Sequence, residues 1–128
     1  MLTLAAVTLG GAVGSAARYG VSLWNVTWFG SNVCGTFTVN IAGSFLLGLI
    51  LGSAEMRPLA LSPAWREGLT VGVMGGFTTF STLMFQAVRQ ADAASPASAA
   101  LNLGGSVSIG LAVTVLGLFA GRHLWCSQ

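Results

Sequence analysis

A run of glycine, hydroxyl and aromatic side chains lies in the middle of a long apolar segment, at residues 75–82. It reads Gly-Gly-Phe-Thr-Thr-Phe-Ser-Thr. Hydroxyl hydrogens can replace water around a small anion, and the edges of aromatic rings carry partial positive charge. Carbonyl oxygens freed at a helix break carry partial negative charge and bind a cation instead. The run therefore indicates an ion site, and composition alone leaves the sign of the ion open.

Gly75 and Gly76 predict an interruption in a membrane-spanning helix. Each glycine destabilises a helix by about 1 kcal/mol relative to alanine. In hydrocarbon an unpaired backbone group costs several kcal/mol, so a helix breaks only where protein, water or an ion takes up the freed groups. We therefore expect the break at residues 75–78, near the middle of the membrane.

The composition excludes a soluble protein. Of the 128 residues, 54% are apolar and 6% are charged, whereas soluble domains carry about 25% charged residues. At about 20 apolar residues per crossing, an all-α membrane protein with four transmembrane helices uses residues 1–128 as a single domain. The N-terminus lacks a basic region and a cleavage site, so we interpret it as the first span and not as a signal peptide. A net charge of +2 without lysine is too weak to indicate nucleic acid.

Four predicted spans position these groups, with the break in the third. Their bounds are about 2–21, 32–53, 64–89 and 98–121. The first contains Gly10 and Gly14, whose GxxxG spacing lets helix backbones approach closely in lipid. We expect this span to end near Arg18 and Tyr19 at the membrane interface, followed by an aromatic-rich loop at 24–31.

Small and polar side chains recur every four residues in the second and fourth spans, and so share one helix face. Those in the second span are Thr36, Asn40, Ser44, Gly48 and Gly52, and those in the fourth are Asn102, Ser106, Gly110 and Thr114. Asn40 is the most polar side chain deep in its span. It either forms an interhelical hydrogen bond, worth about 0.6–2 kcal/mol, or lines a pore, and both interpretations stay open.

The ionisable residues argue against two other classes of protein. The carboxylates Glu55, Glu67 and Asp92 fall in loops or at span ends, whereas a proton-coupled exporter of the small multidrug or guanidinium type needs an acid or histidine inside the membrane. The chain has no nucleophile–base set, and Cys34 and Cys126 are isolated thiols, so an enzyme is not expected. That exporter and a non-transporting assembly subunit remain alternatives.

Three motifs, at residues 10–19, 35–45 and 75–82, resemble those of the fluoride channel family known as Fluc or CrcB. The motifs occur in the family's order over the length of the chain. The resemblance implies a fluoride-selective ion channel that exports fluoride passively across the inner (plasma) membrane and so gives fluoride resistance.

The resemblance also implies an assembly and a set of site residues. The partner is a second copy, in an antiparallel homodimer of dual topology, or a related subunit, so that a non-conducting subunit of a heterodimeric channel is a further alternative. One structural Na⁺ per dimer lies on the central axis, held by the main-chain carbonyls of Gly75 and Thr78, and Arg18 has a vestibule or structural role. The implied fluoride pathway consists of Asn40, Phe80, Ser81, Thr82, Ser106 and Thr114.

The chain departs from the family pattern at one pathway position, where Leu83 replaces a second phenylalanine. Leucine offers no positive ring edge, so we expect a homodimer with slower or altered fluoride flux. The arginines support dual topology, because their numbers on the two sides of the membrane are nearly equal. Arg57, Arg66 and Arg122 are expected on one side, and Arg18 and Arg89 on the other.

Overall fold

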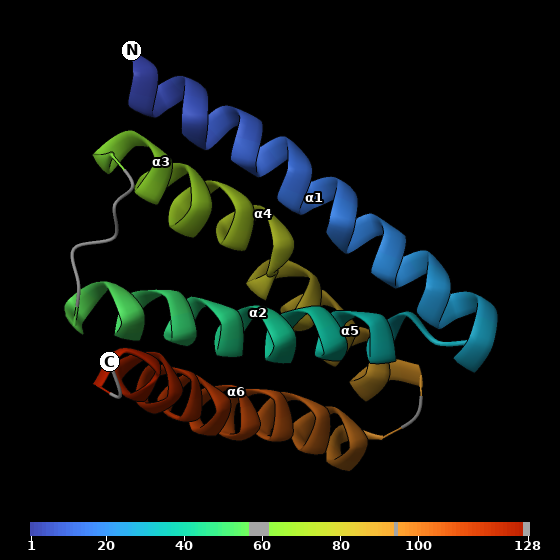
Figure 1. Cartoon of the computed structure of the whole chain (residues 1–128). Coiled ribbons are helices and arrows are strands. Elements are labelled where there is room, and N and C mark those ends of the chain that lie inside the picture. The colour runs from blue at the N-terminus through green and yellow to red at the C-terminus, as the bar shows by residue number, and fades with distance from the viewer. Residues whose placement is uncertain (57–61, 94, 127–128) are drawn as a thin grey trace.

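The computed structural model of the protein describes residues 1–56, 62–93 and 95–126, except for the side chains of Trp125 and Cys126. Every element in this part of the chain is a helix (Figure 1). The long ones are α1 (Leu2–Phe29), α2 (Asn32–Met56), α5 (Phe80–Ala93) and α6 (Pro96–Cys126). Three short ones precede α5, namely α3 (Pro63–Glu67), the π-helical η1 (Gly68–Met74) and α4 (Gly75–Phe77). The predicted all-α chain with an interrupted third segment is therefore confirmed.

The helices form two pairs (Figure 1). α1 lies along α3, η1 and α4 and runs in the same direction, and α2 lies beside α6 with the same parallel sense. The two pairs run in opposite directions to each other. After the break, α5 leaves the first pair and contacts both α2 and α6, so it connects the two halves of the molecule.

Glycines bring α1 against the third segment, and we call this contact the α1 seam. A Cβ atom on Gly72 would lie 2.7 Å from the carbonyl oxygen of Val7, and one on Gly76 would lie 2.7 Å from that of Gly11. Gly10 and Gly14 face the carbonyl oxygens of Gly68 and Val73 even more closely. The close helix approach predicted from Gly10 and Gly14 is confirmed, and the opposing spacing at 68, 72 and 76 completes it.

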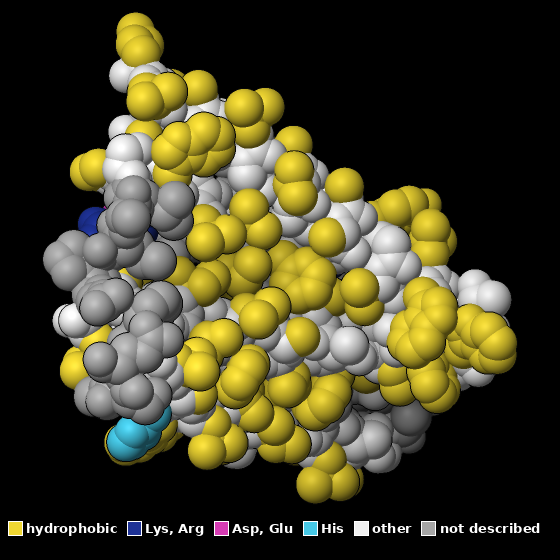
Figure 2. All heavy atoms as spheres, in the orientation of Figure 1, with side chains coloured by type: hydrophobic (Ala, Val, Ile, Leu, Met, Phe, Trp, Pro, Cys, Tyr) yellow, Lys and Arg dark blue, Asp and Glu magenta, His cyan; other side chains and the backbone are white. Residues whose placement is uncertain are grey.

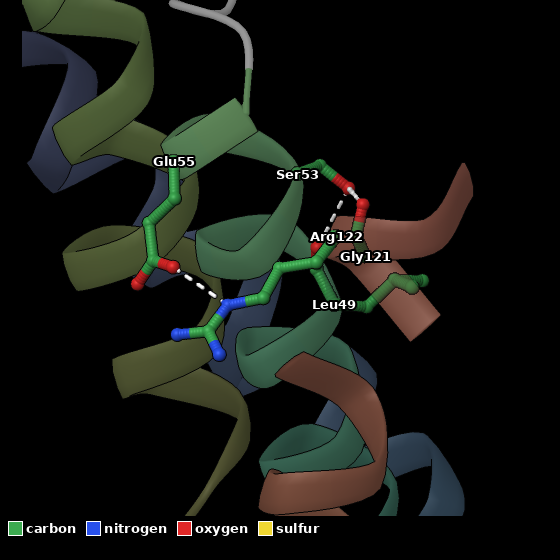
Figure 3. A network of polar contacts seen from close by, with 5 residues as sticks. All are labelled: Leu49, Ser53, Glu55, Gly121 and Arg122. Carbon is green, nitrogen blue, oxygen red and sulfur yellow. Dashed lines mark hydrogen bonds and ion pairs between the residues drawn. The ribbon is translucent and has the colours of Figure 1, made fainter. Parts of the chain in front are cut away.

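A second set of glycines brings α2 against α6, and we call this contact the α6 seam. Its members are Gly48, Gly52, Gly117 and Gly121, each of which faces a backbone carbonyl of the opposite helix. At one end of the seam Ser53 Oγ donates hydrogen bonds to the carbonyl oxygens of Leu49, at 2.8 Å, and Gly121, at 3.4 Å (Figure 3). Beside it Arg122 Nε donates to Glu55 Oε2 at 2.8 Å. This end of the pair is therefore held by both packing and polar contacts.

The predicted loop at 24–31 is wrong, because helix α1 runs through most of it, whereas the predicted end of the first membrane crossing stays a prediction. α1 continues for eleven residues beyond Arg18, to Phe29. Asn25 and Thr27 donate their side-chain hydrogens to backbone carbonyls four residues earlier, at 2.9 Å each, and these bonds follow the helix instead of ending it. The helix ends at Gly30, whose left-handed φ of 63° closes the last turn with a bond from its N–H to the Val26 carbonyl.

Three helical segments in the described part of the chain are long and apolar enough to cross a membrane. They are Asn32–Met56, Pro63–Ala93 and Pro96–Leu124. α1 has 28 residues but is not among them, because Arg18 and Tyr19 lower its mean hydropathy. Hydrophobic side chains cover most of the face seen in Figure 2. Three of the four predicted crossings are thus supported by length and composition, and the crossing by α1 stays a prediction.

Candidate functional site at the helix break

The third segment is interrupted at Thr78 and Thr79. Gly75 and Gly76 are helical, and Thr78 is the first extended residue, with φ −89° and ψ 158°. The Thr78 N–H and hydroxyl both donate to the carbonyl oxygen of Met74, at 3.0 Å each, so this residue ends the helix. The predicted break is confirmed, but it lies at the end of the predicted range 75–78 and not at the glycines.

Asn40 on α2 replaces the helical bonds that the break removes. Its Nδ2 donates to the Thr79 carbonyl oxygen at 3.0 Å, and its Oδ1 accepts from the Thr79 N–H at 2.7 Å. Thr79 in turn starts α5, because its hydroxyl oxygen accepts the Thr82 N–H at 3.3 Å, as an N-cap residue does. Of the two interpretations of Asn40, the interhelical hydrogen bond is therefore present, and its partner is the main chain of the break.

Arg18 on α1 takes up another freed backbone group. Its Nε donates to the carbonyl oxygen of Gly76 at 3.1 Å, and its side chain is half-buried. A cation beside the carbonyl end of a helix is electrostatically favourable. Since the guanidinium lies at the break, the prediction that Arg18 lies at the membrane interface and the prediction that the break lies near the middle of the membrane do not both hold. With Arg18 at the break, Arg89 is the only described arginine at the end of the molecule opposite Arg66 and Arg122. The numbers of arginines at the two ends therefore no longer support dual topology.

Two other carbonyl oxygens at the break receive no hydrogen bond from the described residues, those of Gly75 and Thr78. In a continuous helix they would accept the N–H groups of Thr79 and Thr82, but these are bonded to Asn40 and to the Thr79 hydroxyl. Both oxygens therefore keep their partial negative charge. No cluster of three or more His, Cys, Asp or Glu side chains accompanies them within the described ranges.

A pocket of about 200 Å³, which we call the inner pocket, lies beside the break. Its lining combines amide, hydroxyl and apolar groups from α2, the break and α5, namely Asn40, Gly43, Ser44, Leu47, Thr78, Thr79, Phe80 and Leu83. Phe80 is 70% exposed, whereas Leu83 is 5% exposed. Two predicted pathway residues, Asn40 and Phe80, thus meet in one pocket.

A larger pocket of about 490 Å³, which we call the outer pocket, lies nearer the far end of α5. It is lined by Ser22, Asn32, Val33, Thr36, Thr82, Phe85, Gln86, Arg89, Gln90 and Ala93. Thr79 Oγ1 donates to Thr82 Oγ1 at 3.0 Å, and Thr79 lines the inner pocket. This hydroxyl pair therefore connects the two pockets.

Gln86 and Arg89 line the outer pocket but are not among the predicted pathway residues. Both lie near the end of the predicted third span, 64–89. Their spacing from Thr82, at four and seven residues, places all three on one face of α5, and this spacing is the signal that finds them. Gln86 also fixes the pocket wall, because its Nε2 donates to the Asn32 carbonyl at 3.1 Å.

The remaining predicted residues lie at different places. Ser81 is exposed, with its Oγ 3.4 Å from Thr79 Oγ1. Ser106 is 6% exposed and its hydroxyl has no partner among the described residues. The Asn102–Gln90 hydrogen bond is 2.9 Å long and fixes the register between the antiparallel helices α5 and α6. One turn further along each helix, Ser106 on α6 lies level with Gln86 on α5. The buried Oε1 of Gln86 also has no partner among the described residues. Thr114 lines neither pocket, and its hydroxyl donates to its own helix, to the Gly110 carbonyl at 2.8 Å.

An all-helical chain with three membrane-length segments, one of them interrupted and braced by its neighbours, has the architecture of a multi-pass membrane protein. The family model described as CrcB-like protein, Camphor Resistance (CrcB), matches residues 5–118. The chain therefore belongs to the CrcB-like family, and the resemblance carried by its three motifs is confirmed.

Relatives over nearly the whole chain share a printed name. The protein from Geobacter metallireducens is 41% identical over 97% of this chain and 100% of its own length. That from Acidobacterium capsulatum is 38% identical over 92% and 94%, and that from Agrobacterium fabrum is 39% identical over 98% and 100%. Each is named a fluoride-specific ion channel, FluC.

Proposed function

We propose that this protein is a fluoride-selective ion channel, and not an enzyme, that lets fluoride leave the cell passively. The full-length similarity to proteins named fluoride-specific ion channels carries the proposal. The site agrees with it, because the two connected pockets present hydroxyl, amide and aromatic groups and no carboxylate. Fluoride enters cells as the neutral acid and is trapped as the anion, so a selective leak across the plasma membrane clears it.

The pathway passes from the outer pocket, by the Thr82 and Thr79 hydroxyls, to the inner pocket. Ser81 and Phe80 lie beside this line, and Ser106 offers an unpaired hydroxyl near it. The Asn40 amide has two N–H groups and gives one of them to the Thr79 carbonyl. Its second N–H is free to donate to an anion. Thr114 stays in the proposal on the family resemblance alone.

The functional unit is an antiparallel dimer with one structural Na⁺ on its axis. The carbonyl oxygens of Gly75 and Thr78 fit this ion, because hard cations take oxygen ligands and neither oxygen accepts a hydrogen bond from the described residues. One copy supplies two such oxygens, and a second copy related by a two-fold axis doubles the set. The ion would supply positive charge beside the break. Dual topology rests on the resemblance alone.

Fluoride efflux from liposomes that contain only the purified full-length chain tests the proposal. A fluoride electrode follows efflux with and without Na⁺, and a chloride electrode follows the competing anion. We expect fluoride efflux that depends on Na⁺, and no comparable chloride efflux. Efflux that appears only with a related second subunit would replace the homodimer by a heterodimer. Substrate-driven proton movement without passive fluoride efflux would favour the exporter instead.

A further inference from the structure

The outer pocket contains one ionisable side chain. Of its ten lining residues, Arg89 alone carries a charge. Of the other arginines outside the break that the structure describes, Arg66 forms an ion pair with Glu67 and Arg122 forms one with Glu55. Arg89 is exposed and forms no ion pair with the residues that the structure describes. Its charge therefore acts on the pocket without a bonded counter-charge, although the carboxylate of Asp92, three residues further along α5, opposes it at longer range.

Arg89 lies outward from the hydroxyl groups of the pathway. It follows Thr82 by seven residues on α5, which is about two turns and about 10 Å along the helix axis. Phe85 and Gln86 line the wall between these two positions. An anion that reaches the Thr82–Thr79 pair through this pocket therefore passes the guanidinium first.

A charge at the rim of such a pocket raises the local anion concentration. Low-dielectric walls focus its field into the opening, and the effect on association rates falls as ionic strength rises. Even with the screening of bulk water, one positive charge about 7 Å away raises the local concentration of a monovalent anion about threefold. This enhancement requires no contact between the arginine and the anion.

We propose that Arg89 is the residue that attracts small anions into the outer pocket, so that it sets the rate at which fluoride enters the pathway. This inference rests on the proposed channel function. It assigns Arg89 a long-range role, distinct from that of Arg18, which is hydrogen-bonded to the break. The role depends on the charge of residue 89 and not on the shape of the arginine.

Fluoride efflux from liposomes at two ionic strengths tests the inference. The unaltered chain, Arg89→Gln and Arg89→Lys are compared at about 10 mM and about 1 M of an impermeant salt, equal on both sides, where the Debye lengths are about 30 and 3 Å. Arg66→Gln is the matched control, because Arg66 is an exposed arginine that lines neither pocket. The fluoride concentration is kept low and equal throughout.

We expect Arg89→Gln to lower efflux about threefold at low ionic strength and to match the unaltered chain at high ionic strength. Arg89→Lys and Arg66→Gln should stay close to the unaltered chain in both conditions. Equal efflux by Arg89→Gln at low salt overturns the inference, and so does a loss that is the same at both ionic strengths, since that would reflect altered structure. Absence of fluoride efflux from the unaltered chain would overturn the channel function itself.

Discussion

The α1 seam and the α6 seam are both packed through glycines, but the helices that they join differ in regularity. In both, glycines place one backbone against carbonyls of the next. In the α6 seam both partners are regular helices, closed at one end by Ser53 and the Glu55–Arg122 pair. In the α1 seam one partner is a π-helix followed by a break. The difference is that Asn40 and Arg18 pair with the freed backbone at the break.

The two seams show that glycine packing permits a helix break but does not produce one. Close approach is equally tight on both sides of the molecule. What distinguishes the broken segment is the supply of polar side chains from two neighbouring helices, which lowers the cost of interrupting a helix away from water. Substitutions at three kinds of position, the seam glycines, Asn40 and two arginines, separate these contributions.

The largest effect is expected when a seam glycine acquires a branched side chain. In Gly14→Val and Gly48→Val the new Cβ meets a backbone carbonyl, which cannot move aside as a flexible side chain can. We expect a loss of unfolding free energy of about 1–3 kcal/mol or more, seen as unfolding in detergent at lower temperature, with fluoride efflux lost. Gly20→Ala and Gly104→Ala, which meet open space, should be neutral or slightly stabilising. A tolerated Gly48→Val would show that the α6 seam is not tightly packed.

An intermediate effect is expected at Asn40. Asn40→Ala leaves the Thr79 N–H and carbonyl without their partner, and an unpaired buried group costs about 1–3 kcal/mol. Efflux should fall about tenfold or more. The control on the same helix is Thr38→Val, because the Thr38 hydroxyl bonds only to its own helix, at the Cys34 carbonyl. Full efflux and unchanged stability in Asn40→Ala would mean that the break is held by other contacts.

The last comparison takes one arginine from each helix pair, and the loss of Arg122 is the smallest effect expected. Arg18→Ala removes a charged hydrogen bond to the half-buried break and should cost about 1.5–3 kcal/mol of stability. Arg122→Ala removes an ion pair whose side chains are 44% and 52% exposed. Solvent screens that pair, so its loss should cost about 1 kcal/mol or less and should shrink at high salt. Equal costs for the two arginines, measured by unfolding in detergent, would contradict the proposed role of Arg18 at the break.

The break could be predicted from the sequence because paired glycines and hydroxyls are unusual in a membrane segment. The exact residue at which the helix breaks could not be predicted from the sequence, because Thr78 ends the helix through two hydrogen bonds to the Met74 carbonyl. The extension of α1 was missed for a related reason. The aromatic residues of 24–31 are typical of an interfacial loop, yet Asn25 and Thr27 bond to carbonyls of their own helix.

The polar row of the second span was also only partly predictable. Residues four apart advance by about 40° around a helix, so a row of five turns gradually from one neighbour to another. Asn40 and Ser44 accordingly face the inner pocket, whereas Gly48 and Gly52 face α6. The sequence identified the small and polar positions, and the packing of the other helices decided which partner each one meets.

The two non-helical residues at the break have a consequence for the width of the proposed pathway. Because Thr78 and Thr79 separate α4 from α5, helical continuity does not fix the tilt of α5. Its tilt depends instead on its packing against α2 and α6 and on three polar contacts, from Asn40 to Thr79, from Gln86 to the Asn32 carbonyl, and from Asn102 to Gln90. In the proposed channel, the width of the pathway beside α5 therefore depends in part on Asn32 and Asn102, neither of which lines the inner pocket.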